Sequence, residues 1–249
     1  VKVGTKKAYA SATKMKKSKM FVITKLDDPT ADFYKVFEQL KTEFGPSVCP
    51  VVVPFAKDGK IECYVNLIEM KAYAYDSNGK VAEVDMPESE HRLNGLIEAF
   101  GEAVAETDEE LFEKFFSGEP FTQKELVKGI HKGMNSGVIT PVTCVSSSTL
   151  AGIDMLLKEI SLLLPNPTEV APAEAVSGDD IVEVPADENA PLSAFVFKTV
   201  ADSFGKLSFI KVMSGKLSAN SEIINTVSGQ TEKIGKLYFM CGKKQVETD

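Results

Sequence analysis

The sequence of 249 residues is poor in several features that mark common functional classes. It has one arginine, Arg92, and no C-x-x-C pair among its four cysteines. No apolar run approaches the roughly 20 residues that a membrane-spanning helix needs, and the first residues lack the order of a signal peptide. The isolated cysteines favour buried thiols over a zinc site or a disulfide framework. With a single arginine, the chain lacks the usual bidentate readers of phosphate and guanine. We therefore expect a cytoplasmic protein without a metal site and without a membrane or DNA partner.

The composition is that of a globular protein, with 43% hydrophobic and 26% charged residues, and the length suffices for two domains. The net charge of -8 is unevenly distributed, because residues 1–25 carry only lysines among their charged groups, whereas residues 83–125 are crowded with Asp and Glu. A lysine run such as Lys14 to Lys19 is typical of a solvated helix face, although it could also face nucleic acid or an acidic partner.

The first 45 residues combine helix and strand patterns. A helix is predicted over residues 4–17 and a short buried strand over residues 20–23. Asp28 and Thr30, around Pro29, favour the start of a second helix, which Gly45 and Pro46 end.

Residues 139–165 repeat this order of strand, polar loop and helix. A buried strand is predicted over residues 141–145 and a polar turn over residues 146–149. A helix follows, and its predicted apolar face comprises Ile153, Leu156, Leu157, Ile160 and Leu164. Strand, loop and helix repeated in this way predict an α/β domain with a parallel sheet.

The intervening residues 46–138 form a predicted α+β insertion. Strands are predicted over residues 48–54, 61–70 and 81–84, the last of them at a sheet edge, with a tight turn at residues 57–60. Acidic helical patterns follow over residues 88–116 and 122–132, and Thr122 with Glu125 predicts a capping box.

The last third of the chain changes character. Residues 166–190 contain several prolines and seven acids without a base, which is typical of a linker or an extended surface strap. Residues 191–249 then show a period of two in about four strand-like runs, which predicts part of an antiparallel β-barrel.

Three segments of the sequence resemble the translational GTPase elongation factor G. They are V-G-T at residues 3–5 with the loop at residues 21–27; N-L-I-E-M-K-A-Y at residues 66–73 with A-E-T-D-E-E-L at residues 105–111; and residues 186–242, with A-P-L-S-A-F-V-F-K and F-G-K-L-S-F. The resemblance implies the later part of a P-loop-type GTPase domain (1–45 and 139–165), its inserted subdomain (46–138), the linker (166–190) and a truncated barrel domain II (191–249).

The resemblance also implies that the chain is an internal fragment, and both of its ends look cut. In this family the phosphate loop G-x-x-x-x-G-K-[ST] and the two switch segments precede the position of Val1, and the sequence contains no such loop. That loop cradles the phosphates and places a Lys and a Mg²⁺-binding hydroxyl. We therefore expect no catalytic residue and no GTP hydrolysis by the fragment alone, with Mg²⁺ bound only in the full-length parent.

The guanine-recognition half of the site is implied by two loops, each predicted at the carboxyl end of a parallel strand. Asp27 takes the place of the family's Asp, which accepts two N–H groups from the guanine edge, and Lys25 would lay its stem over the purine ring. Ser146 and Ser147 align with the family's S-A loop: the Ser147 N–H would reach the guanine carbonyl, and Ser146 would fix the loop. Ser147 stands where the family has Ala.

Thr24 departs from the family's Asn, which ties this loop to the phosphate loop. A threonine hydroxyl replaces only part of that amide, and one lost hydrogen bond costs about 0.5 to 1.5 kcal/mol, or roughly three- to tenfold in affinity. T-K-x-D is also similar to the base loop of dynamin-type GTPases. By itself T-K-L-D is a weak motif that is more often the polar end of a strand, and the downstream serine loop favours the guanine interpretation.

The resemblance implies a role in protein biosynthesis: GTP-driven translocation of transfer RNA and messenger RNA on the ribosome, through contacts with ribosomal RNA and ribosomal proteins. Two alternatives remain, a ribosome-protection or other elongation factor G-like paralogue and a non-catalytic module that only binds the ribosome. GTP or GDP binding by the fragment is expected to be weak or absent.

Overall fold

A computed structural model describes residues 1–57, 59–88, 91–202 and 205–249. The described chain divides into two compact units, Val1–Pro165 and Asn166–Asp249. None of its described helices combines the length and the apolar character needed to cross a membrane. The predicted turn at residues 57–60 and the first phenylalanine of F-G-K-L-S-F fall partly outside this description, because it omits Asp58, Ser203 and Phe204.

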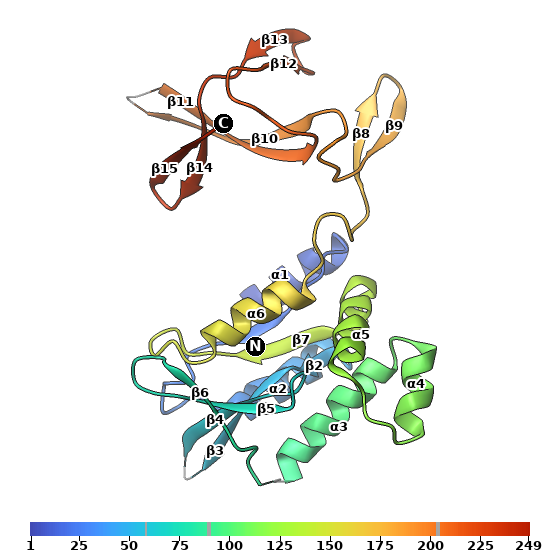
Figure 1. Ribbon diagram of the computed structural model, residues 1–249, viewed down its shortest axis with the longest axis vertical. Coiled ribbons are helices and arrows are strands. Elements are labelled where there is room, and N and C mark those ends of the chain that lie inside the picture. Colours follow the sequence, from blue (N-terminus) through green and yellow to red (C-terminus); the bar gives the residue numbers. More distant parts are fainter. Residues whose placement is uncertain (58, 89–90, 203–204) are drawn as a thin grey trace. The chain divides into compact units, whose positions relative to one another are not determined.

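The first unit alternates strands and helices before and after an antiparallel sheet (Figure 1). Its described elements are α1 (Val3–Lys14), β1 (Phe21–Ile23), α2 (Phe33–Phe44), β2 (Val48–Pro50), β3 (Val52–Lys57), β4 (Lys60–Asn66), β5 (Lys71–Tyr75), β6 (Val81–Val84), α3 (His91–Ala105), α4 (Glu109–Phe116), α5 (Gln123–Ser136), β7 (Thr140–Cys144) and α6 (Ile153–Leu163).

A three-stranded parallel sheet, in the order β1-β7-β2, carries the two loops of interest. The pairing sets Ile23 beside Cys144 and Val48 beside Thr140, so all three strands end at the same edge. β2 lies within the range 46–138 that the sequence assigns to the insertion, yet it pairs with β7 in the parallel sheet. The antiparallel part of this range therefore begins only after β2.

Strands β3 to β6 form a four-stranded antiparallel sheet in sequence order. The two sheets join at Val51, whose N–H donates to the Val142 carbonyl at 2.8 Å and whose carbonyl accepts from the Leu67 N–H at 2.9 Å. The run predicted as one strand over residues 48–54 is thus two strands on either side of this residue. The predicted edge strand over residues 81–84 is confirmed as β6.

The predicted start of the second helix is wrong by several residues. Asp28 accepts bonds from the N–H and hydroxyl of Thr30 at 2.8 and 2.7 Å, which closes a turn around Pro29. The helix instead begins after Asp32, whose carboxylate accepts from the Lys35 N–H at 3.0 Å as an N-cap. A second helix start was predicted correctly, because the Thr122–Glu125 capping box is present in full.

The predicted apolar face of α6 is only partly correct, because Ile153, Leu156 and Leu164 are half-buried but two of its residues are exposed. Leu157 and Ile160 are 63% and 40% exposed, whereas the buried positions are Met155, Glu159 and Leu163. These three residues recur every fourth position and therefore lie on one face of the helix. The sequence pattern did not predict this buried face because one of its three residues, Glu159, is charged.

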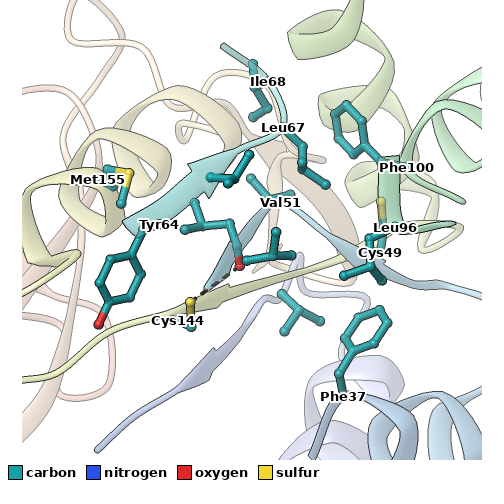
Figure 2. Close-up of a cluster of buried hydrophobic side chains, with 14 of the residues drawn as sticks. Phe37, Cys49, Val51, Tyr64, Leu67, Ile68, Leu96, Phe100, Cys144 and Met155 are labelled. Atoms are coloured by element: carbon teal, nitrogen blue, oxygen red, sulfur yellow. Dashed lines mark hydrogen bonds between the residues drawn. The ribbon is translucent and has the colours of Figure 1, made fainter. Parts of the chain in front are cut away.

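One hydrophobic core serves both sheets and the helices of the first unit. Figure 2 shows its centre, where side chains from β2, β4, β7 and helices α2, α3 and α6 converge. The Cys144 thiol contacts the Val52 carbonyl at 3.5 Å, and burial raises the pKa of this thiol well above its usual range. Cys49 and Cys63 are likewise buried thiols, as predicted, but Cys241 is exposed.

The second unit consists of strands that pair as antiparallel hairpins. Its described strands are β8 (Ala173–Ser177), β9 (Asp180–Val184), β10 (Ser193–Asp202), β11 (Gly205–Ser214), β12 (Glu222–Asn225), β13 (Gln230–Lys233), β14 (Leu237–Cys241) and β15 (Lys244–Thr248). They form four two-stranded sheets, and no closed barrel is found within the described residues. The β8–β9 hairpin lies within the range 166–190 that the sequence assigns to a linker or an extended surface strap. The α/β character of the first unit and the β character of the second agree with the predicted fold class.

Candidate functional site

The two predicted loops lie side by side at the carboxyl ends of β1 and β7. Parallel pairing of these strands brings the residues that follow Ile23 next to those that follow Cys144. The Val145 N–H continues the pairing by donating to the Ile23 carbonyl at 2.9 Å. The carboxyl edge of a parallel sheet is where open α/β folds bind ligands.

A hydrogen bond between side chains joins the loops. The Ser146 hydroxyl donates to Asp27 Oδ1 at 2.5 Å, and Ser146 Oγ accepts from the Thr149 N–H at 3.2 Å. Ser146 is 1% exposed, and its own N–H donates to the Ala151 carbonyl at 2.9 Å. This buried serine therefore fixes its own loop and holds the carboxylate of the other.

Asp27 remains exposed and ionised. The Ser146 hydroxyl is the main cause that lowers the pKa of this carboxyl, with smaller contributions from its own backbone N–H and from the Ser148 hydroxyl. Sequence reasoning missed Ser148, although the run of three serines was a signal for it. An exposed carboxylate with one oxygen held by a hydroxyl can still accept N–H donors on its outer side.

Both loops have residues in the left-handed backbone region. Lys25 has φ of 64° and Leu150 has φ of 63°, values that non-glycine residues adopt at an energetic cost. Gly152, with φ of 77°, ends the second loop, and a Cβ there would lie 2.7 Å from the Cys144 carbonyl oxygen. Strained backbone at two adjacent loops is a property that binding sites share.

Three of the predicted site residues are exposed without fixing the loops. Thr24, Lys25 and Ser147 face solvent, and the described residues include no hydrogen-bond partner for the Thr24 hydroxyl. Lys25 and Ser147 are thus exposed at the edge of the sheet, while Asp27 and Ser146 supply the contact between the loops.

Two clefts of the first unit lie away from these loops. One, of about 440 Å³, lies between α4 and α5, and the other, of about 600 Å³, lies between α2 and α3. Among the described residues, no group of three or more His, Cys, Asp or Glu side chains is placed to hold a metal ion.

Comparison with known proteins gives matches over the whole chain. Residues 191–249 match the family described as elongation factor G domain 2. The whole chain is 34% identical over 251 residues to an elongation factor G-like protein of Thermotoga maritima, of which it covers 36%. A crystal structure of a protein from Thermus thermophilus superposes with a TM-score of 0.81 at 30% identity, covering all of this chain and 35% of that one. The chain spans about a third of the length of these relatives. The resemblance to elongation factor G is confirmed.

Proposed function

We propose that this chain, which is elongation factor G-like and related to translation elongation factors, binds the guanine base of GTP or GDP between the T-K-L-D loop and the serine loop. In this proposal Asp27 accepts the two N–H groups of the guanine edge, and Lys25 covers one face of the ring. The Ser147 N–H donates to the guanine carbonyl. Thr24 lines the site at the first loop, and Ser146 holds the two loops together.

The observation that carries the proposal is the 2.5 Å hydrogen bond from Ser146 to Asp27. It holds an ionised carboxylate in a fixed place at the carboxyl edge of a parallel sheet, where a base can lie against it. Adenine has an amino group in place of the guanine carbonyl, and its adjacent ring nitrogen carries no hydrogen. It would therefore leave the Asp27 carboxylate without its donors. The residues present thus fit guanine and disfavour adenine.

The remaining parts of the activity are proposed on the relationship to elongation factor G. The chain would belong to a cytoplasmic GTPase that acts on the ribosome during translocation, with ribosomal RNA and proteins as partners. The 249 residues contain no phosphate-loop motif, so we expect them to bind guanine weakly and not to hydrolyse GTP alone. Mg²⁺, which neutralises phosphate charge in such enzymes, would act at the phosphates and not at these loops.

The test is a titration of the ¹⁵N-labelled chain with guanosine, GDP and ADP up to millimolar concentration, followed by amide chemical shifts. Guanosine and GDP should shift the amides of Lys25, Asp27 and Ser147, and ADP should not. Asp27→Asn should reduce the ratio of GDP affinity to ADP affinity by about tenfold or more, because one carboxylate oxygen becomes an amide donor.

Asp28→Asn is the matched control. Asp28 is the next carboxylate along the chain, but it is engaged in the turn with Thr30, and an Asn oxygen can still accept those bonds. This variant should keep the guanine preference. Equal responses to guanosine and ADP, or none to either, would contradict the proposal; absence of GTP and GDP binding by a longer protein as well would favour the non-catalytic ribosome-binding module.

A further inference from the structure

The turn between β5 and β6 packs directly against the serine loop. A Cβ at Gly79 would lie 2.7 Å from Leu150 Cβ and 2.9 Å from the Thr149 carbonyl oxygen. In Figure 1 this turn and the loop after β7 are neighbours at the left of the first unit. Gly79 also has φ of 77°, so glycine is favoured here by backbone conformation and by close contact together.

Hydrogen bonds within the turn stabilise its conformation. The Asp76 carboxylate accepts from the N–H groups of Asn78 and Lys80, both at 2.9 Å. The Asp76 N–H also donates to the Lys80 carbonyl at 3.1 Å. These bonds fix the position of Gly79 on the turn, so the surface that meets Thr149 and Leu150 is preformed.

A second contact from the same hairpin reaches the far end of the loop. The Tyr75 hydroxyl donates to Asp154 Oδ1 at 2.6 Å, in the first turn of α6 and two residues after Gly152. Burial and this hydrogen bond raise the pKa of Tyr75, so the phenol stays a donor. One turn further along α6, Lys158 pairs with Glu69, which precedes β5.

We propose that the β5–β6 hairpin is a positioning element for guanine recognition, with Gly79 and Tyr75 as its positioning residues. Leu150 is 53% exposed and has φ of 63°, so its own side chain does little to hold this strained conformation. The contact with Gly79 and the Tyr75–Asp154 bond hold it from outside. They thereby keep Ser146 directed at Asp27 and the Ser147 N–H directed at the ligand. The consequence for binding rests on the proposed function, whereas the packing itself does not.

The test compares Gly79→Ala with Gly59→Ala in the full chain. Gly59 also has positive φ, 76°, but a Cβ there would meet nothing within 4 Å, so both variants carry the same backbone penalty and only one disturbs the loop. We expect hydrogen exchange of the Ser146 and Thr149 amides to be about tenfold faster in Gly79→Ala than in Gly59→Ala. Guanosine affinity should fall about tenfold in the first variant only.

Tyr75→Phe provides a milder test should Gly79→Ala fail to fold. Its control is Tyr34→Phe, which also removes a phenol hydrogen bond, to the Pro54 carbonyl. We expect faster exchange of the Ser146 and Thr149 amides in Tyr75→Phe alone.

The outcomes separate the two proposals. If the unsubstituted chain does not bind guanosine but exchange still responds to Gly79→Ala or Tyr75→Phe, the proposed function fails and the positioning stands. If guanosine binds and each variant exchanges at the rate of its control, the hairpin does not position the loop.

Discussion

A buried carboxyl group on α6 should make the first unit less stable as the pH rises. Glu159 is 2% exposed, and neither of its carboxyl oxygens has a hydrogen-bond partner among the described residues. Burial raises the pKa of Glu159 from 4.5 to about 7, with a further rise from the Glu69 charge, while the nearby Thr143 hydroxyl and Lys158 oppose the shift.

The sign follows from where the proton resides. Between the two pKa values the unfolded chain has lost the Glu159 proton and the folded chain still holds it, so the free energy of unfolding decreases as pH rises. At about 1.4 kcal/mol per pH unit, the full loss is about 3 kcal/mol and is complete above the folded pKa. Glu159→Gln replaces the acid by a neutral group of similar size. It should therefore stabilise the protein by about 3 kcal/mol more at pH 8 than at pH 4.5.

Urea unfolding of both proteins across this pH range, followed by circular dichroism at 222 nm, measures the difference. The described helices α1 to α6 all lie in the first unit, so the signal reports on the unit that contains Glu159. Glu98→Gln, at an exposed position of α3, is the control and should shift stability little at any pH. A Glu159→Gln effect that is constant between pH 4.5 and pH 8 would refute the reasoning.

Four further substitutions test other parts of the structure. Thr122→Ala removes the N-cap that bonds Glu125 and should cost about 1 kcal/mol in thermal unfolding; an unchanged melting temperature would contradict the cap. Leu163→Ala should cost about 2 to 5 kcal/mol in urea unfolding and Leu157→Ala less than about 0.5 kcal/mol, whereas equal costs would argue for the face predicted from sequence. In a longer protein that carries the phosphate loop, Thr24→Asn should tighten GDP binding about three- to tenfold in a calorimetric titration, and weaker binding there would count against the proposed role of this position.

Local patterns predicted several elements because their causes are local. The capping box depends on two residues three positions apart, and the edge strand β6 on a short run between turn residues. The closeness of Asp27 and Ser146 could also be anticipated, because neighbouring parallel strands end at one edge. Their hydrogen bond, with Ser146 buried, is a geometric fact that the sequence only suggested.

Non-local causes explain the misses. β2 pairs with β7, more than 90 positions away in the chain, so nothing near Val48 separates it from β3. The buried face of α6 contains a glutamate, and a periodicity rule assigns glutamates to the surface. The contact between Gly79 and Leu150 joins two turns that the pattern treats as independent.

The position of Val51 between the two sheets limits where a deletion in this protein can begin. Its N–H bonds one sheet and its carbonyl bonds the other, and the residue is fully buried. A shortened variant that excises everything from residue 46 would remove β2 and leave the Val142 carbonyl without its donor inside the core. Excision should instead begin after Val51 and rejoin the chain before Thr140, which keeps the parallel sheet whole. The boundary of the insertion that the sequence pattern assigns and the boundary that the hydrogen bonds of Val51 set are therefore different.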